Sequence, residues 1–83
     1  MKGRIVCSKA GRDKGRFMAV LETDGSFVYV CDGKERPIER PKRKNIKHIA
    51  LTNSSLDITQ FNSNRSLRNA LKSYGASAGF KEE

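Results

Sequence analysis

Turn signals recur every eight to twelve residues along the first half of the chain, and the apolar runs between them are short. Gly11 and Gly15 bracket a charged stretch, and Asp24-Gly25 and Asp32-Gly33 follow. Asp-Gly is a strong hairpin signal, because a tight two-residue turn needs positive φ at its centre. Short runs separated by such close turns predict a small β-barrel and not a helical fold.

Four runs are expected to form strands: residues 4–8, 17–22, 27–31 and 45–51. The run 27–31, FVYVC, is rich in the aromatic and β-branched residues that strands favour. Pro37 and Pro41 lack backbone donors and confine the segment around them to a loop or a sheet edge. The pattern does not fix the register, so which of Ile5, Val6 and Cys7 faces inward stays open.

The remainder of the chain differs in composition, and we expect a boundary near Thr52: residues 1–52 form the barrel and residues 53–83 a C-terminal extension. Within the extension, apolar side chains recur at helical spacing and predict a short helix near 64–74. They are Leu67, Ala70, Leu71 and Tyr74. Ser63 or Asn64 is the expected N-cap, and Gly75 the residue that ends the helix.

Composition excludes several classes of protein. With 83 residues, 31% of them charged, and a mean hydropathy of −0.66, the chain is expected to be a single small domain without a membrane segment. No signal peptide is expected at the N-terminus, so the cytoplasm is the predicted compartment. Disulfides are disfavoured there. Cys7 and Cys31 are therefore predicted to be small buried hydrophobes, although the sequence leaves a bond between them open.

No catalytic or metal-binding constellation is visible. A structural zinc site needs four ligands, and His48 is the only histidine beside the two cysteines. The acidic residues are scattered without a spacing typical of an acid–base pair. The sequence thus predicts a protein that is not an enzyme and that uses no cofactor, metal or small-molecule substrate.

Positive charge is the main functional signal. The chain carries a net charge of +8, and residues 1–51 hold 13 Lys/Arg against six Asp/Glu. Residues 34–47 are the most basic, with seven cations and two acids. A solvated charged loop is the simple interpretation, but five cations within 40–47 repel one another unless a polyanion compensates. We therefore favour a surface that contacts phosphates.

The stretch AGRDKGR, residues 10–16, offers related chemistry. Its glycines permit conformations that expose backbone amides, and Arg12, Lys14 and Arg16 surround the turn with cations that suit phosphate oxygens. A charged hairpin turn that remains in water is an equally good interpretation of this loop alone. Phe17, Phe27 and Tyr29 could stack on bases, but a core this small needs most of them.

The strand, the glycine-bracketed charged turn and the second apolar strand together resemble a KOW domain, an SH3-like RNA-binding module of ribosomal proteins and transcription elongation factors. With FVYVCDG and RPKRKNIKH at this spacing, residues 1–52 most resemble the archaeal and eukaryotic large-subunit ribosomal protein family L-fourteen-e. The resemblance implies a mainly β fold, a small SH3-like β-barrel (KOW domain) with a short C-terminal helix, whose loops and basic face contact ribosomal RNA.

The expected RNA-binding residues fall in the first-hairpin loop and in the basic segment. They are Lys9, Gly11, Arg12, Lys14, Gly15, Arg16, Arg36, Arg40, Lys42, Arg43, Lys44, Lys47 and His48. The predicted function is RNA binding, with ribosomal RNA or the ribosome as partner, by a cytoplasmic, ribosome-associated protein that is monomeric when free. The alternatives are an SH3-like or Tudor-like protein-interaction module and an accessory module of transcription elongation.

Overall fold

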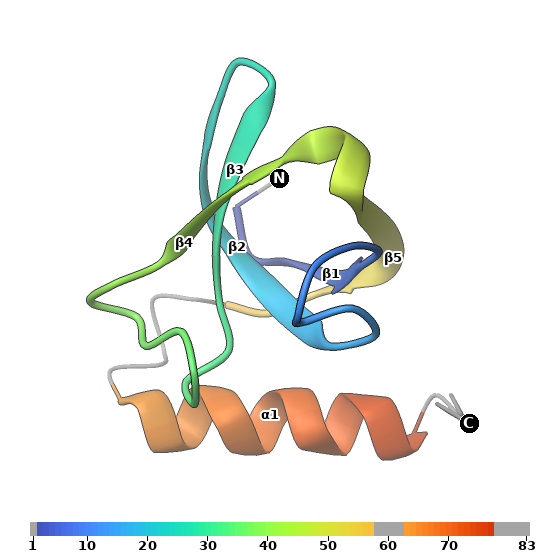
Figure 1. Ribbon diagram of the computed structural model, residues 1–83. Coiled ribbons are helices and arrows are strands. Elements are labelled where there is room, and N and C mark those ends of the chain that lie inside the picture. Colours follow the sequence, from blue (N-terminus) through green and yellow to red (C-terminus); the bar gives the residue numbers. More distant parts are fainter. Residues whose placement is uncertain (1, 58–62, 78–83) are drawn as a thin grey trace.

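Five antiparallel strands form one strongly curved sheet, and a single helix lies across its outer side (Figure 1). The computed structural model describes residues 2–57 and 63–77. The elements are β1 (Arg4–Ser8), β2 (Phe17–Asp24), β3 (Phe27–Cys31), β4 (Lys42–Asn45), the 3-10 turn η1 (Ile46–His48), β5 (Ile49–Ser55) and α1 (Asn64–Ser77). Their order in the sheet is β4-β3-β2-β1-β5. This arrangement confirms the prediction of a mainly β, barrel-like domain with a C-terminal helix.

The strand predicted at 45–51 is wrong in part. Residues 42–45 instead form the edge strand β4, and the next three residues form η1 before β5 begins at Ile49. The side chain of Asn45 causes this break, because its Oδ1 accepts a hydrogen bond from the backbone N–H of Lys47 and caps the turn. η1 thereby carries the chain from one edge of the sheet to the other, where β5 continues past Thr52 to Ser55.

The middle of the sheet is buried on both faces, which explains why β1, the first half of β2 and β3 contain adjacent apolar residues. Side chains on the concave face form the inner core, which comprises Val6, Met18, Val20, Val28, Val30 and Ile49. On the opposite face, Ile5, Ala19 and Cys31 form a second cluster with Leu67 and Leu71 of α1. The question that the sequence left open is thus answered: Val6 faces the inner core, and Ile5 faces α1.

Helix α1 is longer than predicted. Ser63 is its N-cap, since its Oγ accepts a hydrogen bond from the backbone N–H of Ser66. The helix does not end at Gly75 but continues to Ser77. Packing overrides the low helix propensity of glycine at this point, because Tyr74 meets the ring of Phe17 edge-on at 5.1 Å between centroids.

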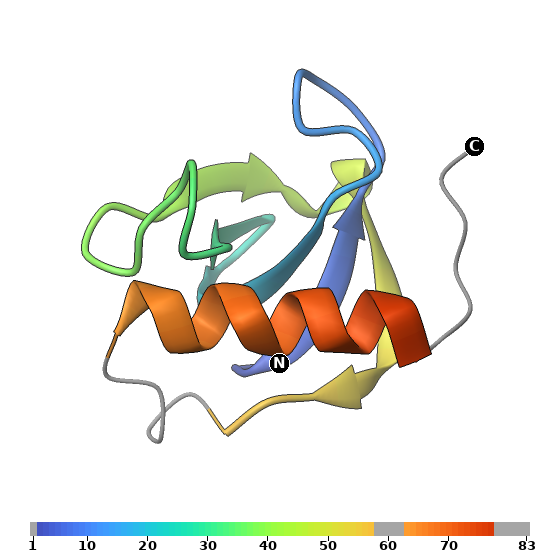
Figure 2. The same ribbon diagram turned by 90° about the horizontal axis from the view of Figure 1, so that it is seen from below.

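The first turn of α1 is fastened to the loop that follows β3. Asn64 accepts a hydrogen bond from the backbone N–H of Ile38 at 2.7 Å and donates one to the carboxylate of Glu39 at 3.0 Å. Beside them, Gly33 adopts a φ of 78° and its Cα approaches the backbone of the helix closely. Seen from below, α1 crosses in front of the sheet, and the loop between β1 and β2 projects away from the helix (Figure 2).

Candidate nucleic-acid interface

The loop between β1 and β2 is an ordered extension of the hairpin. Ser8 and Arg16 continue the pairing, with Ser8 N–H donating to the Arg16 carbonyl at 3.0 Å. The N–H of Gly15 donates back to the Ser8 carbonyl at 2.8 Å. Gly11 and Gly15 have φ values of 87° and 89°, a conformation that side chains other than glycine rarely adopt. The two glycines therefore allow two overlapping tight turns within the loop, at Gly11–Lys14 and Asp13–Arg16.

Asp13 organises the interior of this loop. Its Oδ1 accepts hydrogen bonds from Ser8 Oγ at 2.7 Å and from Lys44 Nζ at 2.9 Å. Its Oδ2 lies 3.4 Å from Lys42 Nζ. Lys44 Nζ also donates to the carbonyl of Ala10 at 3.0 Å, and both Asp13 and Lys44 are buried. The carboxylate thus ties the loop to β4, the edge strand of the basic segment.

These partners change the acidity of Asp13. Burial raises the pKa of its carboxyl, but the hydrogen bonds from Ser8 and Lys44 and the charges of Lys44 and Lys42 outweigh burial. The net result is a pKa lowered from 3.8 to about 2. Asp13 is therefore fully ionised at neutral pH, and it neutralises part of the positive charge that the loop and β4 bring together.

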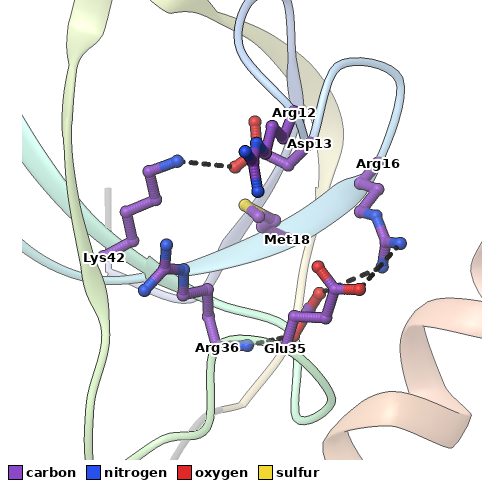
Figure 3. Close-up of a pocket in the computed structure, with 8 residues that line it drawn as sticks. Arg12, Asp13, Arg16, Met18, Glu35, Arg36 and Lys42 are labelled. Atoms are coloured by element: carbon purple, nitrogen blue, oxygen red, sulfur yellow. Dashed lines mark hydrogen bonds and ion pairs between the residues drawn. The ribbon is translucent and has the colours of Figure 1, made fainter.

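A pocket of about 330 Å³ opens beside this network (Figure 3). It is lined by Arg12, Asp13, Arg16, Met18, Asp32, Glu35, Arg36 and Lys42. Two of its cations come from the first-hairpin loop and two from the basic segment, and the labelled side chains surround Met18. The fold thus unites two basic stretches that are about twenty residues apart in the sequence.

Three of the predicted site residues are engaged within the protein. Arg16 forms ion pairs with Asp32 at 3.7 Å and Glu35 at 3.3 Å, and Lys42 and Lys44 both contact Asp13. The burial of Lys44 leaves its ammonium group no access to a partner outside the protein. Its role in the structure is to hold the loop, a role that the basic pattern of residues 42–47 does not reveal.

The other predicted basic side chains are exposed, and within residues 2–57 and 63–77 none of them forms an ion pair. They are Lys9, Arg12, Lys14, Arg36, Arg40, Arg43, Lys47 and His48. The backbone N–H of Lys9 donates to the His48 carbonyl at 2.8 Å and so brings η1 beside the loop. Arg43 stacks over the ring of Phe27, 3.8 Å from its centroid, on the outer side of the sheet. It therefore lies apart from the pocket.

Sequence reasoning missed the acidic residues of the site. Asp13, Asp32 and Glu35 were grouped with scattered surface acids, yet each pairs with a predicted RNA-binding cation. One signal was available: Asp13 is the single acid within the cationic stretch 9–16. A lone carboxylate among four cations is well placed to be their shared partner.

The two cysteines differ in burial. Cys31 is a free, buried thiol, as predicted for a small hydrophobe, whereas Cys7 is only half-buried. Burial, followed by the charge of Asp32, raises the pKa of the Cys31 thiol to about 11.

Within the part of the chain that the structure describes, no cluster of three or more potential metal ligands occurs, and no helix is long and apolar enough to cross a membrane.

Comparison with known proteins relates this fold and its basic surface to a family. No protein-family model matches the chain. A curated protein of Staphylothermus marinus, named large ribosomal subunit protein eL14, is 30% identical over 81 residues, which is 96% of this chain and 84% of that protein. The eL14 proteins of Pyrobaculum calidifontis and Pyrobaculum islandicum are each 31% identical, covering 96% and 88% of this chain and 79% and 72% of their own lengths.

The similar proteins thus form one class, ribosomal proteins of the large subunit, and no enzyme name occurs among these three. Within that class, the chain belongs to the eL14 family, the L-fourteen-e family that its sequence resembles. The similarity is more extensive than expected, because an alignment of 81 residues cannot fit within residues 1–52. It therefore includes residues of the C-terminal extension.

Proposed function

We propose that this chain binds ribosomal RNA as a component of the large ribosomal subunit, and that it does so mainly through phosphate contacts. The observation that carries the proposal is the pocket in which Arg12 of the first-hairpin loop lies near Arg36 of the basic segment. Guanidinium groups bind phosphate oxygens in a bidentate manner, and two of them from separate segments can grip adjacent phosphates.

Charge distribution around the pocket supports this proposal. Lys14 and Lys9 flank Arg12 in the loop, and Arg40 extends the basic segment. All three are exposed, whereas Asp13 and Glu35 are already neutralised by Lys44 and Arg16. The surface therefore keeps its positive potential even though acids line the pocket, and such a potential favours a polyanion.

The same geometry supports RNA over the Tudor-like alternative, which needs an aromatic cage. Among the described residues, Phe17 packs against Tyr74, and Phe27 lies under Arg43. Their faces are thus occupied within the protein. The family supports association with the ribosome. Our proposal accordingly includes a cytoplasmic, ribosome-associated protein that is monomeric when it is free.

A titration with a transcribed fragment of large-subunit ribosomal RNA tests the proposal. We expect log K to fall linearly with log salt concentration, with a slope of about −0.7 to −0.9 for each phosphate contacted. The double variant Arg12→Gln/Arg36→Gln should bind more weakly and with a shallower slope. Arg65→Gln/Arg68→Gln is the matched control, since it removes the same charge from the exposed side of α1. Salt-independent binding, or equal losses for both double variants, would contradict the proposal.

A further inference from the structure

The pocket that Arg12, Arg16, Arg36 and Lys42 line is called the cationic pocket below. A second hollow lies at the other end of β2 from it. It is a shallow groove of about 600 Å³ beside the β2–β3 hairpin. Its lining residues are Leu21, Glu22, Thr23, Asp24, Tyr29 and Pro41, and we call it the hairpin groove. It contains no cation, although the chain as a whole carries a charge of +8. Its walls combine two carboxylates with the apolar surfaces of a leucine, a proline and a phenol ring.

The carboxylates of the hairpin groove differ from the other acids among residues 2–57 and 63–77. Asp13, Asp32, Glu35 and Glu39 each hold a hydrogen bond or an ion pair. Asp57 also has an interaction partner. Glu22 and Asp24 are exposed, and neither carboxylate forms a hydrogen bond or an ion pair within the described part of the chain. They are therefore available to a partner outside the protein.

The pairing of β2 with β3 places the side chains of Glu22 and Asp24 on one face of the sheet. Glu22 lies opposite Tyr29 and Asp24 opposite Phe27 in the β2–β3 pair, and residues two apart on a strand share a face. Arg43 lies opposite Tyr29 on β4, but its guanidinium stacks over Phe27 and does not line the groove. The two carboxylates thus lie on one face at this end of the sheet, and no described cation lines the groove beside them.

We propose that the hairpin groove binds a basic segment of a neighbouring protein. Lysine or arginine side chains of that segment pair with Glu22 and Asp24, while an apolar side chain packs against Tyr29 and Pro41. Charge complementarity selects such a partner over nucleic acid, since a polyanion meets two unpaired carboxylates here. This contact uses a surface separate from the cationic pocket, so it does not depend on the proposed RNA function.

Peptide binding to the full chain tests this inference. The probe is a fluorescein-labelled peptide of seven residues in which lysine alternates with leucine, and a glutamate–leucine peptide of the same length is its control. We expect a dissociation constant of about 1 mM or tighter for the lysine peptide. Glu22→Gln/Asp24→Asn should weaken its binding roughly tenfold, because both ion pairs are lost. Glu39→Gln serves as the exposed control and should have no effect.

Two further measurements locate the contact. In NMR spectra, the lysine peptide should shift the backbone amides of residues 21–29, whereas RNA should shift those of residues 10–16. The Glu22→Gln/Asp24→Asn variant should keep the RNA affinity of the native chain, so failure of this inference can be told apart from failure of the RNA proposal. The inference is overturned if the lysine peptide does not bind, binds the double variant equally well, or leaves residues 21–29 unshifted while RNA shifts them.

Discussion

Asp13 Oδ1 lies 2.9 Å from Lys44 Nζ, and both side chains are buried although the residues are 31 positions apart. The pair joins the loop between β1 and β2 to the edge strand β4. A buried ion pair is sensitive to the loss of one partner, because the remaining charge is left uncompensated in a poorly solvated site. Several properties of the protein follow from this contact and from the packing around it.

Replacing Asp13 with alanine should destabilise the protein by about 3–5 kcal/mol, since Lys44 then stays buried without its carboxylate. Urea unfolding measures the change. Lys14→Ala is the control within the same loop, because Lys14 is exposed, and it should alter the free energy of unfolding by less than about 0.5 kcal/mol. The double variant Asp13→Ala/Lys44→Met should recover part of the loss. An Asp13→Ala effect as small as that of Lys14→Ala would contradict the buried pair.

Stability should depend on pH through the same carboxylate. The pKa of Asp13 is about 2 in the folded protein, below its ordinary value of 3.8, so the folded state binds this proton less readily than the unfolded state. Ionised Asp13 contributes roughly 2 kcal/mol to the free energy of unfolding. This contribution is complete above pH 3.8 and is lost as the pH falls toward 2. The native chain and Asp13→Asn should be unfolded in urea across this range. The stability difference between them should shrink on acidification, and a constant difference would refute the assignment.

Cations of the first-hairpin loop should contribute unequally to RNA binding. Arg12 is exposed and forms no ion pair within the described residues, whereas Arg16 pairs with Asp32 and Glu35. Neutralising Arg12 with glutamine should reduce the salt slope of RNA binding by about 0.7–0.9, the value of one phosphate contact. Arg16→Gln should change the slope much less, because the protein's own acids engage its guanidinium. Identical changes in a salt titration of the two variants would count against this distinction.

Gly33 should be the least replaceable of the turn glycines. A Cβ there would collide with the carbonyl oxygen of Asn64 and lie 3.0 Å from the backbone nitrogen of Arg68, while φ is 78°. Gly25 has a φ of 62° but open space around it, so Gly25→Ala meets backbone strain alone. Gly33→Ala should therefore lower stability by about 1–3 kcal/mol more than Gly25→Ala. Thermal unfolding followed by circular dichroism checks this, and equal melting temperatures would show that α1 is not packed against Gly33.

Local sequence patterns predicted most of the sheet. The bounds of β1 and β3 agree with the apolar runs at 4–8 and 27–31, because β-branched and aromatic residues dominate there. The strand β4 was not expected, since Lys42–Asn45 contains no apolar residue. Its formation depends on pairing with β3 and on the contacts of Lys44 and Lys42 with Asp13, which are tertiary interactions. Such partners leave no periodic signal in a single sequence.

The candidate site, too, could be predicted from the sequence only in part. Residue type and spacing identified the cations of the loop and of the basic segment, but they could not show which of them are engaged within the protein. Arg12 and Arg16 are both arginines of one short loop, yet only Arg16 forms an ion pair with Asp32 within the described residues. That difference arises from the approach of the chain after β3, about sixteen residues away in sequence.

The contacts of Ser8, Lys44 and Asp13 inside the first-hairpin loop also bear on the kinetics of recognition. A loop held at its centre by a buried carboxylate has given up its conformational entropy during folding, so little remains to be lost when a polyanion arrives. Association at this surface should then be limited by diffusion and steered by the long-range field of the exposed cations, without a slow rearrangement step. The acid that lowers the local positive charge thus also keeps the loop in a shape that is ready to bind.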